Sequence, residues 1–425
     1  MFRVARRFGS QRERHLGPAI ICLLVLGCSS APTASPQEIQ DDRGSGVSSE
    51  QSDSEASSSD EVLADDRGSG VSSEQSDSEA SSSDEVLADD RGSGVSSEQS
   101  DSESLNPNNV TISQPLTIEV FAANDVEDSV AEAILASLNL AANMWGLYWP
   151  VEYWVMGLDP EAGEELVDRF CSRREERDEW DYKSCMAREA GSEQHSMIEY
   201  QQLGAQAVAE NRAFGTAGHN GGFDWGIHRF TTTLPWGLAG RFGTPGAEDV
   251  KTVLHEYWHA VQHSFISTLD RDKRDRAMGP VWFAEGSAEF MAQYGAAQLI
   301  SEGLMPEVPK GEWPFSYEEQ MANKLWDIEN EFANGCAERN LSSIIEYSDP
   351  CSRVGYELGA WAMALLLSET GTDVLLNDFH PIVERVGWEE AFEATFGRTV
   401  AQLDQDVKRF WELPRNQKMA LLPNP

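Results

Sequence analysis

VLHEYWHAV, residues 253–261, is the stretch that decides both the fold and the chemistry that this chain can support. On a helix, residues four positions apart lie on one face, so His255 and His259 can present their imidazoles to a single metal ion. Glu256 follows the first of these histidines and can accept a proton beside that ion. This HExxH pattern therefore predicts a zinc site with a carboxylate base next to it.

The helix that carries these histidines is expected to begin at Thr244 and to end near Ile266. Threonine at the N-cap, followed by proline in the first turn, is a typical helix start. A metzincin would have a third histidine six residues after the second one, and Phe265 occupies that position. His263 shares the face of the two histidines, but the helical rise places it about 6 Å further along the axis. We therefore expect His263 to take no part in metal binding.

A second motif, WFAEGSAEF at residues 282–290, supplies the candidate third ligand. It resembles the WLxEGxAEY element of the gluzincin zinc peptidases. The resemblance implies that Glu285 is a zinc ligand from a second helix. It also implies that Glu289, one turn later, orients a ligand histidine without binding the ion itself. The gap after His259 is longer than in thermolysin or in the aminopeptidase N type, and the charged stretch 270–275 can absorb the difference.

A third motif, VGYELGAW at residues 354–361, resembles the YEKGA element of the aminopeptidase N family. The resemblance implies that Tyr356 donates its hydroxyl to the oxyanion of the transition state; a tyrosine packed in the core at a helix start is the alternative. Residues 387–397 resemble the C-terminal helical part of such peptidases. The Gly-x-Met-Glu-Asn element that holds a substrate's amino group is absent before His255, so an N-terminal exopeptidase is not supported.

Together these resemblances imply zinc-dependent hydrolysis of peptide bonds in a peptide or protein substrate. The implied ligands of Zn2+ are His255, His259 and Glu285. Glu256 is implied to take a proton from water and to pass it to the departing amine, while Tyr356 stabilises the negative oxygen. Two other functions stay open. One is a gluzincin fold that serves as a non-catalytic binding or adhesion module, and the other is a zinc hydrolase of a non-peptide substrate.

The surrounding sequence predicts an α+β domain over residues 112–425, and the resemblance implies a thermolysin-like zincin fold. Such a fold has a small N-terminal sheet, a largely helical C-terminal lobe and zinc in the cleft between them. Alternating or helical spacing of apolar residues places the elements, and Asn124 or Asp125 is the expected cap of the first helix. The expected elements are a strand over 111–122, a helix over 126–146, a strand over 151–156, a charged and mostly helical insertion over 165–215, and loop and strand over 215–243. His219 and His228, in the last segment, either contact substrate or are ordinary loop histidines.

Four cysteines of this domain form two local pairs, Cys171 with Cys185 and Cys336 with Cys351. Four cysteines allow three connectivities, and the short loops favour the local one. In an exported protein we expect disulfides rather than free thiols, each stabilising the fold by about 3 kcal/mol through the unfolded state. Neither pair has the CxxC-like spacing of a zinc site.

The N-terminus predicts export and a lipid anchor. Residues 1–27 have the basic region and short apolar stretch of a signal peptide, too short to span a bilayer. VLGC, residues 25–28, resembles the bacterial lipobox, which implies acylation of Cys28; an ordinary signal peptide is the alternative. Ser29 resembles the sorting position of outer-membrane lipoproteins. The predicted location is the bacterial cell envelope, at the outer membrane or cell surface, with the lipid as the only membrane contact.

Residues 28–111 predict an acidic, low-complexity tether. The 24 residues of 41–64 recur unchanged at 65–88, and the first 15 of them recur at 89–103. A repeat of this length is also typical of solenoids, but each unit has too few large apolar side chains to offset the entropy of ordering. We therefore expect a disordered, self-repelling spacer. Calcium binding by its acidic clusters is a further alternative, although the Gly-centred ligand loop is missing.

The charge of the whole chain limits its partners. The formal net charge is −40 at pH 7, and much of it lies on the folded part. An acidic surface of this size repels nucleic acid and anionic lipid. We therefore expect no nucleic-acid partner, and solubility outside the cell is the ordinary reason for such a charge.

Overall fold

The computed structural model describes residues 94–98, 115–191, 195–210, 216–219, 227–233, 247–305 and 316–425. All of these residues belong to the same compact unit. The predicted signal peptide, the predicted lipid-attachment residue Cys28, most of the predicted tether and the expected helix start at Thr244 lie outside the described residues. Among the helices in the described part of the chain, none combines the length and the apolar character needed to cross a bilayer.

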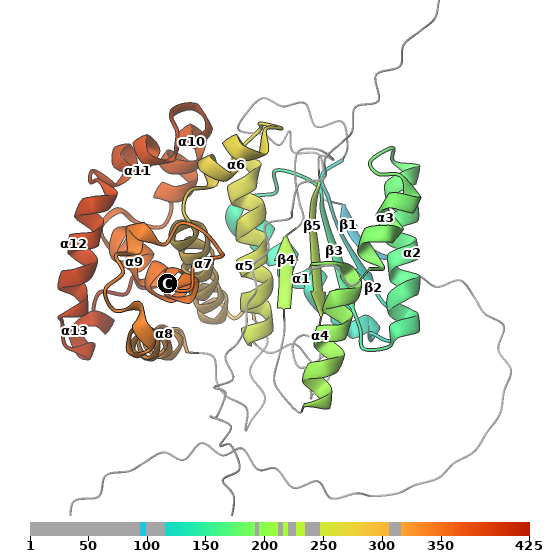
Figure 1. Cartoon of the computed structure of the whole chain (residues 1–425), viewed down its shortest axis with the longest axis horizontal. Coiled ribbons are helices and arrows are strands. Elements are labelled where there is room, and N and C mark those ends of the chain that lie inside the picture. Colours follow the sequence, from blue (N-terminus) through green and yellow to red (C-terminus); the bar gives the residue numbers. More distant parts are fainter. Residues whose placement is uncertain are drawn as a thin grey trace, which may run out of the picture. The chain divides into compact units, whose positions relative to one another are not determined.

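A mixed five-stranded sheet forms the N-terminal part of this unit (Figure 1). Its strands are β1 (Gly94–Glu98), β2 (Thr117–Ala122), β3 (Val151–Met156), β4 (Thr216–His219) and β5 (His228–Thr233). Their order in the sheet is β1-β2-β3-β5-β4. The three central strands are parallel, and each edge strand is antiparallel to its neighbour. Parallel neighbours need a long crossover, which α1 provides between β2 and β3.

Helices make up most of the rest, so the expected α+β class is confirmed. The helical segments are α1 (Asp128–Trp145), α2 (Pro160–Glu176), α3 (Tyr182–Glu189), α4 (Met197–Ala209), α5 (Ala247–Ser264), α6 (Arg271–Met278), α7 (Val281–Ser301), α8 (Tyr317–Glu331), η1 (Phe332–Cys336), η2 (Leu341–Ser343), α9 (Ser352–Thr370), η3 (Leu375–Phe379), α10 (His380–Val386), α11 (Trp388–Phe396), α12 (Val400–Trp411) and α13 (Arg415–Met419). Helices α2 to α4 fill the predicted insertion, and α6 fills the charged stretch between the two metal-site motifs.

The two faces of the sheet pack against different helices. Side chains alternate between the faces of a strand, and in β3 this alternation places Tyr153 on one face and Trp154 on the other. Tyr153, which is fully buried, belongs to a large core with residues of α1, α5, α7 and α9. Trp154 belongs to a smaller core with α2, α3 and α4. The face that bears Tyr153 is therefore the one that α5 covers (Figure 1).

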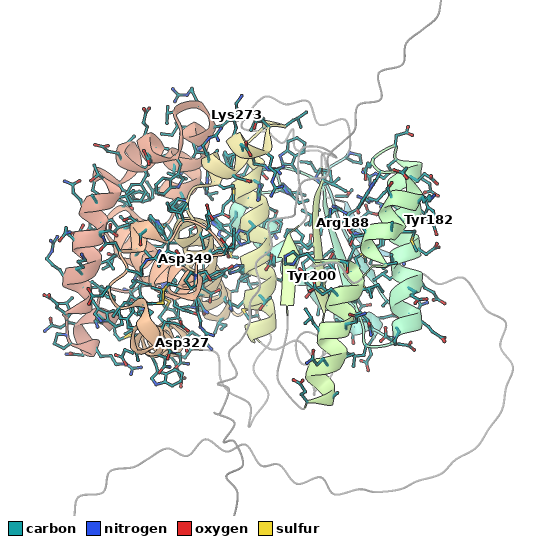
Figure 2. All side chains as sticks on the ribbon, in the orientation of Figure 1. Tyr182, Arg188, Tyr200, Lys273, Asp327 and Asp349 are labelled. Carbon is teal, nitrogen blue, oxygen red and sulfur yellow. A yellow bond between two sulfur atoms is a disulfide. The ribbon has the colours of Figure 1, made fainter. Side chains whose placement is uncertain are left out.

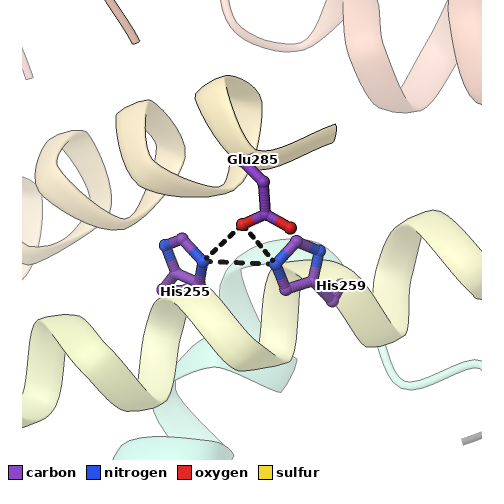
Figure 3. A group of neighbouring side chains, drawn as sticks. All are labelled: His255, His259 and Glu285. Atoms are coloured by element: carbon purple, nitrogen blue, oxygen red, sulfur yellow. Dashed lines mark hydrogen bonds and ion pairs between the residues drawn. The ribbon is translucent and has the colours of Figure 1, made fainter. Parts of the chain in front are cut away.

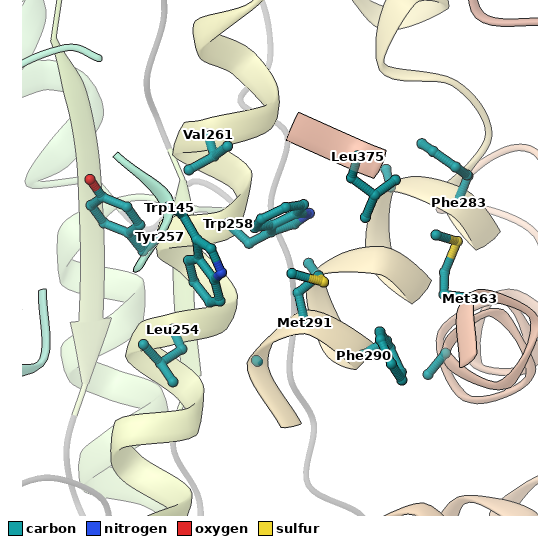
Figure 4. Packing of buried hydrophobic residues seen from close by; sticks show 14 of the residues in the cluster. Trp145, Leu254, Tyr257, Trp258, Val261, Phe283, Phe290, Met291, Met363 and Leu375 are labelled. Atoms are coloured by element: carbon teal, nitrogen blue, oxygen red, sulfur yellow. The ribbon is translucent and has the colours of Figure 1, made fainter. Parts of the chain in front are cut away.

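Helix α7 lies at the centre of the C-terminal lobe, between α5 and α9 (Figure 1). Figure 4 shows Phe283, Phe290 and Met291 of this helix among the apolar side chains that fill the lobe. Nearly all residues of α7 are buried, on every side of the helix. A helix surrounded in this way belongs to the interior of a large domain. Any charged side chain on α7 must therefore find its partners inside the protein.

Strand β1 lies inside the segment for which the repeats predict no ordered structure. Its sequence, GVSSE, belongs to the third, incomplete repeat. The strand pairs antiparallel with β2, so that Val95 lies opposite Val120. Pairing at a sheet edge uses backbone groups, which every sequence possesses, and so needs few apolar side chains. Composition alone could not indicate this strand.

Both disulfides join the local pairs that the sequence predicts. Cys171 in α2 is bonded to Cys185 in α3, and Cys336 at the end of η1 is bonded to Cys351 just before α9. The local connectivity is thereby confirmed. The second disulfide closes a loop that contains Asp349, labelled in Figure 2.

The expected cap of the first helix is wrong. Helix α1 begins at Asp128, and its N-cap is Glu127, whose side chain makes no capping hydrogen bond. The carboxylate of Asp125 instead accepts hydrogen bonds from the backbone N–H groups of Leu158 (2.6 Å) and Asp159 (2.8 Å). Asp125 thus organises the start of α2 rather than that of α1, a long-range use that local sequence does not indicate.

Buried histidines should make the fold sensitive to acid, and His380 offers a test. Burial lowers the pKa of His380 to about 3, and its ring stacks on Phe265. Because the unfolded chain binds the proton near pH 6.5, stability should fall as the pH drops from about 6.5 towards 3. At pH 5 this residue alone should cost about 2 kcal/mol. Replacing His380 with Phe should remove that loss, measured as the free energy of unfolding in urea at pH 7.5 and 5.0. Equal acid losses in both proteins would contradict the assignment.

Candidate metal site

Helix α5 carries the HExxH residues, as the sequence predicts for this stretch. His255, Glu256 and His259 are all buried, with 0, 0 and 2% of their surface exposed. The two histidines, one turn apart, face α7, which carries Glu285 (Figure 3). The helical spacing and the packing of α5 on α7 thus bring together residues 26 positions apart in sequence.

Three ligand atoms converge between these helices. Nε2 of His255 lies 3.2 Å from Nε2 of His259, and each nitrogen lies 3.4 Å from Oε2 of Glu285 (Figure 3). Glu285 is fully buried as well. The group formed by these three side chains can bind a metal ion. We call it the metal triad below.

The far side of His255 is held by a buried ionic network. Its Nδ1 lies 3.0 Å from Oε2 of Glu289, one turn after Glu285 on α7. The ammonium group of Lys324, from α8, lies 2.7 Å from Oε1 of Glu289, and that of Lys251 lies 3.3 Å from it. Because the carboxylate can only accept, Nδ1 of His255 must donate the hydrogen bond. In the neutral form of this imidazole, the lone pair is therefore on Nε2, where it faces Glu285.

The far side of His259 is held by Gln262, one turn further along α5. Oε1 of Gln262 lies 2.7 Å from Nδ1 of His259. The amide nitrogen of Gln262 donates to the backbone oxygen of Ala284 (3.0 Å) and to Oγ of Ser287 (2.8 Å). With its N–H groups committed, the amide can only accept from His259. The lone pair of this second imidazole is thus also on Nε2, inside the metal triad.

The charges of the site favour a cation among the three ligands. Burial alone would lower the pKa of His255, but its hydrogen bonds with Glu285 and Glu289 raise it to about 9. Burial alone would raise the pKa of Glu285, but the two histidines hold it far below its usual range. Lys251 and Lys324 likewise outweigh burial and keep the pKa of Glu289 well below normal. Both glutamates are therefore anionic, and positive charge between the ligand atoms is stabilised.

Glu256 differs from the other acidic residues of the site. Both of its carboxylate oxygens are buried, and neither has a hydrogen-bond partner among the described residues. Burial raises its pKa to about 7, although His255 and His259 oppose the shift. A carboxyl group with a pKa near neutrality can both take up and release a proton under ordinary conditions. Buried carboxylates without partners are costly, so Glu256 does not stabilise the fold through its charge.

The remaining residues considered from the sequence lie in three different settings. Tyr356 is half-buried in the first turns of α9, next to Glu357, whose carboxylate accepts from Lys324 at 2.7 Å. His228 is not a loop histidine: it is a buried residue of β5 whose Nε2 lies 3.1 Å from Oγ of Ser264. His263 is also buried.

Sequence reasoning missed four side chains that contact the triad or its supporting residues: Lys251, Gln262, Lys324 and Tyr347. Two of them had a local signal, because Lys251 precedes His255 by four positions and Gln262 follows His259 by three, so each shares a helix face with its histidine. Lys324 and Tyr347 come from distant segments, and nothing in their local sequence marks them. The hydroxyl of Tyr347 donates to Oε1 of Glu285 at 2.6 Å.

The site can therefore bind a cation through three converging ligands and can move a proton through Glu256 next to them. Its supporting contacts fix both imidazoles in the tautomer that metal binding requires. Comparison of the chain with protein-family models, with curated proteins and with solved structures gave no match.

Proposed function

We propose that this chain is a zinc-dependent peptidase with a gluzincin-like active site. The observation that carries the proposal is the convergence of His255, His259 and Glu285 beside a buried carboxylate, Glu256, that has no other described partner. Ligands that bind a metal ion and a base that can activate water are the two parts that metal-assisted hydrolysis requires.

The ligand atoms have a spacing that is compatible with zinc. Atoms bound at zinc's usual distance in tetrahedral geometry lie about 3.4 Å from one another. The three separations in the metal triad are 3.2, 3.4 and 3.4 Å. Two imidazoles and one carboxylate are also a common ligand set of catalytic zinc, while magnesium and calcium prefer oxygen.

Each residue then has a definite task. A bound divalent ion would lower the pKa of water and polarise a carbonyl group. Glu256 takes a proton from the attacking water and returns it to the departing amine. Glu289 and Gln262 keep the histidines in orientation and in the correct tautomer. Tyr356 remains the candidate donor to the oxyanion.

An edge strand supports an extended peptide as the substrate. Strand β4 forms the end of the sheet, antiparallel to β5, and packs beside α5 (Figure 1). On its outer side it pairs with no strand of the described chain. An extended peptide can pair with the backbone groups of such an edge. A substrate bound in this way would run alongside the helix that carries Glu256.

A non-catalytic binding module and a hydrolase of other substrates are the competing functions. Glu256 argues against the first, because a buried carboxylate without a partner destabilises the fold and a binding module gains nothing from it. The edge of β4, which no described strand covers, argues against the second, because it offers backbone pairing that peptides can use. No observation favours either competitor.

Metal content is the direct test of the site. We expect the purified protein to retain about one zinc ion per chain and the His255→Ala variant to lose it, because two ligands cannot replace three in a catalytic site. His195→Ala serves as the control, since it removes an imidazole outside the site. The metal is measured by mass spectrometry after exhaustive dialysis. Zinc retained by His255→Ala, or absent from the wild-type protein after reconstitution, would contradict the proposal.

A further inference from the structure

The two carboxylate oxygens of Glu285 have different surroundings. Oε2 lies 3.4 Å from Nε2 of both histidines of the metal triad, whereas Oε1 accepts the hydrogen bond of 2.6 Å from the hydroxyl of Tyr347. Glu285 is fully buried, while Tyr347 is 39% exposed. Tyr347 therefore extends from the metal triad towards solvent and touches the one oxygen that does not face the histidines.

Tyr347 is carried by a loop with fixed ends, residues 337–350. The disulfide between Cys336 and Cys351 joins the two residues that flank this loop. Within it, the guanidinium group of Arg339 binds both carboxylate oxygens of Asp349, at 3.1 and 2.5 Å. The disulfide and this bidentate ion pair restrict the backbone on either side of Tyr347. The tyrosine is thus presented by a constrained segment.

The same loop is attached to the helix that carries Glu285. The backbone N–H of Val281, the first residue of α7, donates to the backbone oxygen of Ile345 at 3.0 Å. Val281 precedes Glu285 by one helical turn, and Ile345 precedes Tyr347 by two residues. This backbone hydrogen bond fixes the loop against α7 close to both Tyr347 and Glu285. The hydrogen bond between their side chains therefore does not depend on a flexible side chain alone.

We infer that Tyr347 is a positioning residue that fixes how Glu285 presents its carboxylate to the metal ion; the inference rests on the proposed function of this site. With Oε1 bound to the phenol, only Oε2 faces the histidines. Without the phenol, the carboxylate can rotate and can offer both oxygens to the ion. Contacts that orient metal ligands in this way typically change metal affinity by about 10- to 100-fold.

A purely structural role for Tyr347 predicts a different result. Its ring is too exposed to contribute much to the core, so loss of the hydroxyl would then change the stability of the fold slightly and leave metal binding alone. A role in positioning Glu285 predicts the reverse, because the partner of the hydroxyl is a metal ligand. Metal affinity and ligand geometry therefore separate the two possibilities.

The test compares Tyr347→Phe with Tyr294→Phe, which removes a tyrosine hydroxyl that contacts the backbone oxygen of Asn424. Zinc affinity is measured by competition with a chromophoric chelator, and the visible spectrum of the Co2+-loaded protein reports coordination. We expect Tyr347→Phe to weaken zinc binding about 10-fold or more and to alter the Co2+ spectrum, with Tyr294→Phe matching wild type. Wild-type values for Tyr347→Phe in both measurements would overturn this inference alone. Absence of metal binding in wild type as well would overturn the proposed function together with it.

Discussion

Replacing Glu256 with glutamine is expected to lower kcat for peptide hydrolysis by about 10³-fold while leaving the metal content unchanged. Glutamine has almost the same shape as glutamate but cannot take up the proton of the attacking water. The residue lies next to the metal triad without belonging to it, so the three ligands remain intact. The measurement combines zinc content with cleavage of a mixed peptide library, followed by mass spectrometry. Near wild-type cleavage by Glu256→Gln would exclude this residue as the base.

A control variant and a stability measurement make this experiment specific for the role of Glu256. Glu302→Gln makes the same chemical change at an exposed position at the end of α7 and should leave cleavage unaffected. Glu256→Gln should also be at least as stable as wild type, because it removes a buried carboxylate that has no described partner. Gained stability with lost turnover is the expected signature of a residue retained for catalysis. Lost stability would indicate a structural role instead.

The local pattern of the sequence was enough to predict the two histidines of the candidate site, and the resemblance of residues 282–290 to a known motif supplied Glu285. His255 and His259 share a helix face because of their spacing, and the same rule places Glu289 one turn after Glu285. The contact between His255 and Glu289 follows from the packing of two such helices. The cysteine pairs were predictable for a similar reason, since short loops favour local disulfides.

Contacts between distant segments could not be predicted in this way. Tyr347 reaches Glu285 from a position 62 residues further along the chain, and Lys324 reaches Glu289 from α8. Their positions depend on tertiary packing, for which a single sequence has no periodic signal. Strand β1 was missed because edge pairing relies on backbone groups, and the cap of α1 was misassigned because Asp125 has distant partners.

The position of Glu285 also depends on the packing of α7 against α9. This packing in turn requires glycine at two positions. A Cβ atom added at Gly359 would lie 2.3 Å from the backbone oxygen of Trp282, and one added at Gly286 would lie 2.4 Å from the carbonyl carbon of Gly359. Contacts this short involve backbone on both sides, so a side-chain rotation cannot relieve them. The helices can touch here only because both positions lack a side chain. Gly286 directly follows Glu285, the candidate metal ligand, so this helix contact fixes how close the backbone of Glu285 lies to α9.

Replacing Gly359 with alanine is therefore expected to lower the free energy of unfolding by about 3 kcal/mol and to weaken zinc retention. The added methyl group must push α9 away from α7 at the turn that carries Glu285. Gly355→Ala is the matched control, because it adds the same methyl group one turn earlier on α9. The three atoms nearest to that methyl group would be two side-chain atoms at 3.1 Å and 3.5 Å and one backbone atom at 3.6 Å. Urea unfolding and zinc content are measured for both variants. If Gly359→Ala were as stable as Gly355→Ala, the two helices would have room to separate, and the position of Glu285 would have to be fixed by Tyr347 and the histidines instead.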